Sequence, residues 1–141
     1  MKIITLVIIF LTLFLRAEFT RHGKTVKDSV TSLEWQDSYN SEDIKKATWS
    51  EALIYCDELI LDNKSDWRVP SLNELESIVD YNKYNPATSH IFQHIVTDAY
   101  WSSTTDGLDS FKAWYVYFKY GDDGWSDKKY KGRVRCVRGE Q

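Results

Sequence analysis

The chain contains 141 residues, of which 43% are apolar and 15% aromatic, and its formal net charge is −3. This length and composition predict one domain with a well-filled core, and they exclude a disordered chain. The acidic balance argues against a nucleic-acid-binding protein, because the field of the whole molecule would repel a polyanion.

Residues 1–17 have the pattern of a secretory signal peptide. Lys2 provides a basic start, residues 3–15 are mainly apolar, and the small Ala17 precedes a polar sequence. The apolar run of 13 residues is shorter than an ordinary membrane-spanning helix. We therefore expect a mature domain, residues 18–141, that is exported to the periplasm or cell surface and has no membrane span after cleavage. An uncleaved anchor is the alternative.

The first elements of the predicted mature domain are a hairpin and a helix. Residues 25–28 and 33–35 are β-prone runs separated by a turn, and residues 37–46 form a polar loop. Thr48 and Glu51 have the spacing of a capping box, which predicts that a helix begins here. Six apolar residues follow on one face of this helix: Trp49, Ala52, Leu53, Cys56, Leu59 and Ile60.

A joint between an extended segment and a second helix lies at the centre of the chain. Pro70 disfavours helical geometry in the residue before it, and Ser71 with Glu74 forms a second capping box. The apolar spacing then predicts a helix over about residues 72–81. Trp67 and Arg68 are expected to anchor the extended segment, the first by buried area and the second by its donors.

The second half of the chain reads as irregular structure followed by strands. Residues 82–97 carry breaking signals, with Phe92 expected in the core, and residues 99–103 favour a strand. Residues 113–118 form a strongly β-prone run with two opposed faces. We expect a turn at residues 121–124 and a closing strand at residues 132–138.

The chain has two cysteines, Cys56 and Cys136. In an exported protein the natural interpretation is a single disulfide between them. Such a bridge closes a loop over most of the mature domain, and in the chain-entropy model it stabilises the fold by roughly 4 to 5 kcal/mol.

Six motifs in a fixed order give the chain a resemblance to a known family. They are TVKD at residues 25–28, LEWQ at 33–36, TWSEA at 48–52, DWRVP at 66–70, YWSS at 100–103 and VRCVR at 134–138. Over about residues 19–139 the chain resembles the Lcl C-terminal domain family, named for the trimeric collagen-like adhesin of Legionella.

The resemblance implies a C-type-lectin-like fold of the α+β class, with two helices packed on small antiparallel sheets joined by long loops. In that fold a helix is commonly tied to the last strand by a disulfide, and Cys56 and Cys136 stand at those places. The fold hosts calcium-dependent lectins, protein binders, enzymes and structural modules, so it does not select a function by itself. The adhesin's domain is linked to host glycosaminoglycan binding, which the acidic charge of this chain opposes.

The sequence argues against an enzyme and against a metal or cofactor site. Enzymes of the distantly similar formylglycine-generating type need reactive thiols, and both cysteines are expected in the disulfide. Residues 85–87 lack the carboxylate of the calcium-lectin tripeptides. Residues 121–127 carry three aspartates that favour a solvated hairpin turn over a cation site. His90 and His94 are four apart, without a third ligand.

Three aromatic residues are the candidates for ligand binding: Tyr120, Trp125 and Tyr130. They surround the segment expected to be a long loop, where side chains of this size stack on sugars or fill a partner's pocket. Seven other motif residues are expected to be structural: Trp49, Trp67, Arg68, Pro70, Glu74, Trp101 and Arg135. Arg68, Arg135 and Arg138 could form an anion site, but we expect Arg68 and Arg135 to bind loop carbonyls and carboxylates such as Glu74 instead, because each lies in a motif that also carries Trp or Cys.

We expect an exported bacterial binding module without catalytic activity, which recognises a glycan or a protein of the cell envelope or surface. The alternative is a structural or assembly component of a periplasmic complex. An enzyme is disfavoured because no nucleophile, base and orienting group can be named together.

Overall fold

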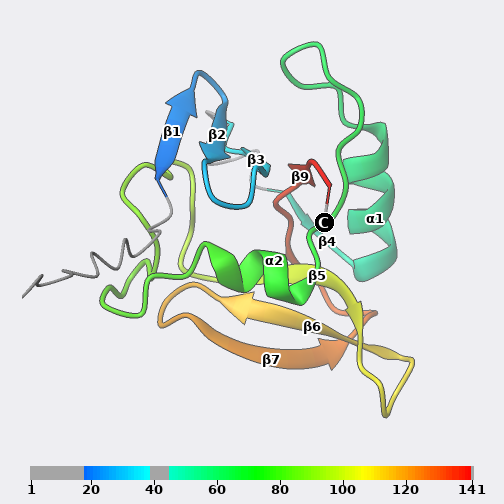
Figure 1. Ribbon diagram of the computed structural model, residues 1–141. Helices are drawn as coiled ribbons and strands as arrows, with labels where there is room; N and C mark the ends of the chain where they lie inside the picture. The colour runs from blue at the N-terminus through cyan, green and yellow to red at the C-terminus, as the bar shows by residue number, and fades with distance from the viewer. Residues whose placement is uncertain (1–17, 39–44, 141) are drawn as a thin grey trace, which may run out of the picture.

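The computed structural model describes residues 18–38 and 45–140, which form two helices and two small sheets (Figure 1). One sheet has four strands, in the order β1 (Phe19–His22), β2 (Thr25–Asp28), β3 (Glu34–Gln36) and β9 (Val137–Arg138). The other has five, in the order β4 (Lys46–Ala47), β8 (Gly132–Arg133), β5 (Ala99–Thr105), β6 (Lys112–Tyr117) and β7 (Asp122–Asp127). The predicted signal peptide lies outside the described residues.

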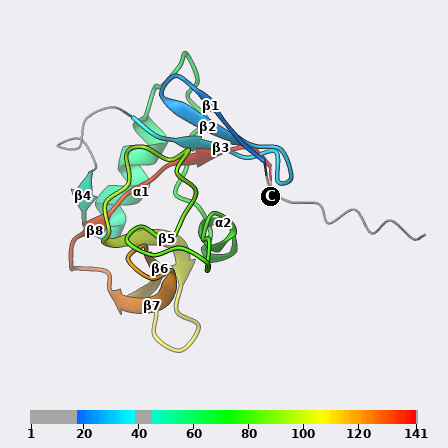
Figure 2. The same ribbon diagram turned by 90° about the vertical axis from the view of Figure 1, so that its left-hand side faces the viewer.

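All strand pairs are antiparallel except β5 with β8, and the two helices are α1 (Trp49–Glu58) and α2 (Leu72–Ser77). Figures 1 and 2 both show strands β1 to β3 at the top and β6 and β7 at the bottom, with the helices between. The predicted α+β class, with two helices on small and mostly antiparallel sheets, is confirmed, and this is the layout expected of a C-type-lectin-like fold.

The predicted hairpin is present and is extended by a strand that the sequence analysis did not identify. Strands β2 and β3 pair with Val26 opposite Trp35, and both side chains are fully buried. Strand β1 adds to β2 through a turn at Gly23, whose positive φ of 63° suits a residue without a side chain. Only alternate residues of β1 are partly buried, which explains its weak hydrophobic signal.

Helix α1 begins at the predicted capping box. The Glu51 amide donates to the Thr48 hydroxyl and the Thr48 amide donates to the Glu51 carboxylate, at 3.4 and 2.8 Å. Ala52 and Cys56 form its buried stripe. The prediction that Ile60 shares this stripe is wrong, because the helix ends at Glu58 and Ile60 is 75% exposed.

Helix α2 also has its predicted capping box, with Ser71 and Glu74, but it is shorter than predicted. It ends at Ser77, where the sequence analysis extended it to residue 81. The backbone beyond it is bound to a later segment: the Thr88 hydroxyl donates to the carbonyl of Ile78, and Val79 forms an isolated antiparallel bridge with Thr88. These contacts replace the hydrogen bonds that another helical turn would make.

The hairpin of β6 and β7 corrects the predicted turn at residues 121–124. The turn is residues 118–121, closed by the Gly121 amide donating to the carbonyl of Tyr117 at 2.8 Å. Gly121 has a φ of +84°, which favours glycine. Gly124 instead lies inside β7, opposite Tyr115. Trp125 is therefore a residue of an outer strand and not of a loop.

The predicted closing strand at residues 132–138 is two strands in different sheets. Strand β8 belongs to the five-stranded sheet and β9 to the four-stranded sheet, and residues 134–136 cross between them. A single regular strand cannot serve both sheets. Val134 and Cys136 are buried in this crossing segment, as predicted.

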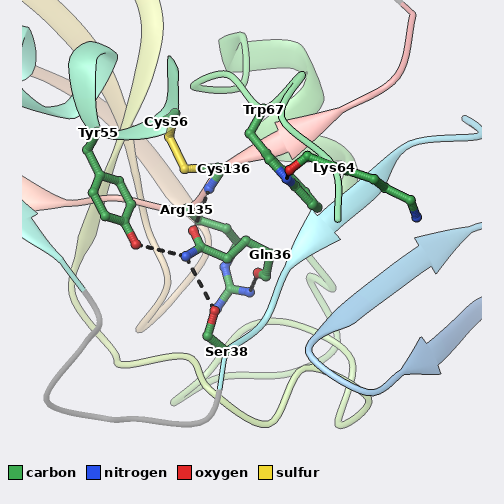
Figure 3. Close-up of a disulfide and its surroundings, with 8 residues drawn as sticks. All are labelled: Gln36, Ser38, Tyr55, Cys56, Lys64, Trp67, Arg135 and Cys136. Atoms are coloured by element: carbon green, nitrogen blue, oxygen red, sulfur yellow. Dashed lines mark hydrogen bonds between the residues drawn. A yellow bond between two sulfur atoms is a disulfide. The ribbon is translucent and has the colours of Figure 1, made fainter. Parts of the chain in front are cut away.

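The predicted disulfide between Cys56 and Cys136 is present and ties α1 to the crossing segment (Figure 3). Gln36 lies beside it: the Cys136 amide donates to its side-chain oxygen at 3.1 Å, and its side-chain nitrogen donates to the Tyr55 hydroxyl at 2.9 Å. The bridge therefore joins the helix to the crossing segment just before the last strand, at a point where the side chain of Gln36 connects both to β3.

Two buried clusters form the core, and β6 contributes to both. Val116 packs with Trp35, Leu75 and other residues of the first cluster, while Ala113 belongs to the second cluster with Trp67 and the disulfide. This division follows from the two opposed faces that the sequence predicts for residues 113–118. Phe92 is buried in the first cluster, as expected.

Candidate functional site

Exposed aromatic side chains lie along the outer hairpin of the five-stranded sheet and the segment after it. Tyr120 is in the turn between β6 and β7, Trp125 is on β7, and Tyr130 follows β7. Their exposed fractions are 51%, 51% and 59%. All three residues predicted as ligand contacts are therefore accessible to a ligand.

Each of these rings has a lysine ammonium over it. The pairs are Lys119 with Tyr120 at 5.3 Å, Lys112 with Trp125 at 4.3 Å and Lys129 with Tyr130 at 5.2 Å from Nζ to ring centroid. Such cation–π contacts are worth roughly 0.5 to 1 kcal/mol at exposed sites. They favour one orientation of each ring at the surface, while more than half of each residue stays exposed.

The structure does not bring the three predicted contacts into one site. Successive residues of a strand point to opposite faces, so Trp125 and Ser126 lie on opposite faces of β7. Trp125 is opposite Trp114 on one face, whereas Ser126 and Tyr130 line a pocket on the other. Tyr120 contacts Tyr117 at the far end of the hairpin, with ring centroids 6.2 Å apart.

The pocket beside Tyr130 has a volume of about 210 Å³. Its floor comes from β5, β6 and β7, and its wall is the segment that leads from β7 into β8. The lining residues are Ala99, Trp101, Tyr115, Ser126, Tyr130, Lys131 and Gly132. The sequence analysis identified Tyr130 but not Tyr115 or Ser126, which face the pocket because of the register between β6 and β7.

Two glycines fix the rings of this pocket. A Cβ on Gly132 would meet the Trp101 indole at 2.9 Å, and one on Gly124 would meet the Tyr115 hydroxyl at 2.6 Å. Both rings therefore lie directly against backbone, in space that any other residue would occupy. The indole of Trp101 is further held by its Nε1, which donates to the carbonyl of Ala47 at 3.0 Å. The positions of the Trp101 and Tyr115 rings are therefore fixed by the protein itself, whereas Tyr130 and Lys131 lie at the exposed edge of the pocket.

The residues predicted to be structural lie in the interior or in ion pairs. Trp67, Pro70 and Trp101 are buried. The half-buried Trp49 donates from Nε1 to the carbonyl of Ser102 at 2.9 Å, and the ammonium of Lys128 lies 3.9 Å from its ring centroid. These contacts describe where the side chains lie, and their roles in stability remain predictions.

Arg135 is a buried cation with buried partners. It is 3% exposed, and it donates to the Asp37 carboxylate at 2.9 Å and to the carbonyls of Gln36 and His94. Arg21 also donates to Asp37, which is itself 1% exposed. Asp37 was missed by the sequence analysis because it begins a polar stretch that reads as a solvated loop. The tie between Arg135 and loop carbonyls is the arrangement predicted from its motif.

Arg68 and Arg138 are likewise engaged with carboxylates. Arg68 binds Glu74, and Arg138 binds both Glu34 and Asp66. The three arginines that were considered as an anion site are therefore each paired within the protein.

The candidate metal ligands do not converge. Asp122 and Asp123 are neighbours on β7 and point to opposite faces, and Asp127 lies at the other end of the strand, 3.4 Å from the Lys129 ammonium. His90 and His94 lie on an irregular segment and not on a helix. Among residues 18–38 and 45–140, no group of three or more histidine, cysteine or acidic side chains could hold a metal ion.

No helix within the described parts of the chain is long and apolar enough to cross a membrane.

The family model described as the Lcl C-terminal domain matches residues 24–138, which include both helices, both cysteines and the pocket beside Tyr130. No curated protein matches the chain.

Proposed function

The chain belongs to the Lcl C-terminal domain family, and on this basis we propose that it is an exported, non-catalytic binding module of the bacterial cell envelope or surface that recognises a glycan or a protein partner. Its ligand contacts come from among the exposed aromatic residues Tyr120, Trp125 and Tyr130, which lie at separate places on the domain, so one ligand need not touch all three. No cofactor takes part.

The observation that carries this proposal is the set of exposed rings on a rigid sheet. Exposed aromatic residues on a soluble domain mark contact surfaces, because they bury a large area on binding while losing little conformational freedom. Here the rings of Trp125 and Tyr130 are further restrained by lysines and lie on or beside regular strands. This surface can bind a ligand without first becoming ordered.

Export is supported by the disulfide, because such bridges persist in oxidising compartments. Export with removal of the signal peptide predicts that the mature chain begins near Glu18. N-terminal sequencing of the protein recovered from periplasm and medium tests this, and Met1 retained in the membrane fraction would favour an anchor instead.

The absence of catalytic activity is supported by the contacts that the cysteines and arginines make within the protein. Both cysteines are joined to each other, and Arg68 and Arg135 are bound to carboxylates. The alternative, a structural or assembly component of a periplasmic complex, is favoured by one feature. The loop between β5 and β6 projects from the domain and carries Leu108 and Phe111, which are 99% and 77% exposed (Figure 1).

A glycan array and a pull-down from envelope extract distinguish these functions. Each is run with the wild-type protein and with a variant of the loop, Leu108→Ser together with Phe111→Ser. A glycan bound equally by both proteins supports the binding module. An envelope protein captured by the wild type and lost with the loop variant, with no glycan bound by either, would favour the assembly component.

A further inference from the structure

The pocket beside Tyr130 has the size of a single sugar ring. Its volume is about 210 Å³. Pockets for drug-sized ligands begin near about 300 Å³. A pyranose ring fits this space, whereas a second ring of the same glycan would have to remain outside.

The solvent exposure of the aromatic residues increases from the floor of the pocket to its rim. Trp101 is 2% exposed, Tyr115 is half-buried, and Tyr130 is 59% exposed. A pyranose presents apolar C–H groups on its faces and hydroxyls around its edge, so it packs flat against an aromatic ring. Tyr115 and Tyr130 both line the pocket and each offers an aromatic ring against which a pyranose can pack.

The polar groups of the lining match sugar hydroxyls. Tyr115 and Ser126 line the pocket from adjacent strands, and each has a hydroxyl that can both donate and accept a hydrogen bond. A sugar hydroxyl has the same double capacity. Because none of the seven lining residues carries a carboxylate, a calcium ion would lack its usual charged ligands there.

The charges near the pocket favour an uncharged sugar. Lys131 is the one charged lining residue, and it is exposed. Two neighbouring cations are already paired: Lys129 lies 3.4 Å from Asp127, and Arg133 donates to Asp98 at 3.1 Å. A carboxylate or sulfate on a sugar would therefore meet one solvated ammonium and not a cluster of donors, which gives little affinity.

We propose that this pocket binds one uncharged pyranose residue of a glycan, stacked on Tyr130 and Tyr115, without calcium. The inference rests on the proposed binding function and narrows its ligand class and its site. It also places the sugar on the face of β7 that does not carry Trp125.

The test uses the exported protein and a panel of neutral hexose, N-acetylhexosamine and uronic acid glycans, with affinities measured by calorimetry in buffer containing EDTA. Tyr130→Ala removes the exposed wall of the pocket, and Trp125→Ala is the matched control because it removes an equally exposed, lysine-covered ring from the other face. We expect a neutral glycan to bind in EDTA. Tyr130→Ala should weaken it by about tenfold or more, and Trp125→Ala by less than about twofold.

Three results would overturn the inference and leave a glycan-binding module in place: binding of acidic glycans alone, loss of binding in EDTA, or loss with Trp125→Ala and not with Tyr130→Ala. If the protein binds no glycan of the panel, the inference is overturned. The proposed binding function would then be limited to protein partners. Circular dichroism of both variants should match the wild type, since both side chains are exposed.

Discussion

Arg68 and Glu74 form a two-pronged ion pair across the joint that leads into α2. The two guanidinium nitrogens lie 2.6 and 2.7 Å from the two carboxylate oxygens, and Glu74 is 9% exposed. The same carboxylate accepts from the Ser71 amide at 2.8 Å. Glu74 therefore caps the helix and holds the extended segment before it with one side chain.

This double use predicts a graded response to substitution. Glu74→Gln can still accept from the Ser71 amide but loses the charge that Arg68 faces, whereas Glu74→Ala loses both. We expect Glu74→Gln to lower the free energy of unfolding by about 1 to 3 kcal/mol, with a larger loss for Glu74→Ala. Urea unfolding measures both: equal losses would show that only the ion pair matters, and an unchanged Glu74→Gln would show that only the cap matters.

The capping boxes explain why the beginnings of both helices were predictable and their ends were not. In a capping box, two residues three positions apart satisfy free backbone amides at the helix start. The start can therefore be predicted from local sequence. The end of α2 depends on Thr88, ten residues beyond Ile78, whose hydroxyl binds the carbonyl there. A contact of that kind has no local signal.

Acid should destabilise the protein through Glu34 and Glu74. Burial by itself raises the pKa of Glu34, but hydrogen bonds from Lys64 and Arg138 outweigh it and hold the pKa below its ordinary value. Burial of Glu74 is outweighed in the same way by Arg68 and Ser71, so its pKa is also lowered. The ionised forms of both residues therefore add to the free energy of unfolding. This stabilisation is fully present above the unfolded-state pKa and is lost as the pH falls through the folded-state pKa.

We therefore expect the melting temperature to fall between about pH 5 and pH 3, with a smaller fall in Glu34→Gln, which starts from a lower melting temperature at pH 7. Glu76 is the contrasting residue, because burial and then Asp123 raise its pKa. Its ionised form is disfavoured in the folded protein, so Glu76→Gln should raise the melting temperature at neutral pH and have no effect near pH 3. An identical acid response in wild type and Glu34→Gln would contradict the assignment.

The disulfide should contribute more to stability than any single side-chain contact. It joins residues 80 apart in sequence, and in the chain-entropy model a loop of this length is worth about 4 to 5 kcal/mol. The double variant Cys56→Ala with Cys136→Ala should lose about that much in urea unfolding. Wild-type protein unfolded in the presence of reductant is the control and should match it. A double variant as stable as the oxidised wild type would exclude this contribution.

Local sequence identified the candidate binding residues, but it did not establish which face each occupies. Two glycines three residues apart, Gly121 and Gly124, both read as turn residues. Only the first adopts a positive φ, and the second lies extended in β7. Placing the turn three residues too late, at residues 121–124, moves Trp125 into a loop and hides the pairing of Tyr115 with Gly124. The pocket depends on this register, which follows from the turn at residues 118–121 that the Gly121 amide closes by donating to the carbonyl of Tyr117.

Trp67 and Trp125 provide the final prediction, because the same residue type occupies opposite environments. Trp67 is 2% exposed, belongs to the core cluster around the disulfide, and donates from Nε1 to the carbonyl of Lys64 at 3.1 Å. Trp125 is 51% exposed on an outer strand. Truncating a buried tryptophan typically costs about 3 to 5 kcal/mol, which is a large part of the stability of a small domain.

We therefore expect Trp67→Ala to lower the melting temperature sharply or to prevent folding, while Trp125→Ala loses little beyond its contact with Lys112, about 0.5 to 1 kcal/mol. Differential scanning calorimetry of the two variants beside the wild type measures this contrast. Trp67→Phe is the informative intermediate, because it keeps most of the buried area but removes the donor to Lys64, so its stability should lie between wild type and Trp67→Ala. A stably folded Trp67→Ala protein, together with an unfolded Trp125→Ala protein, would reverse the assignment of core and surface.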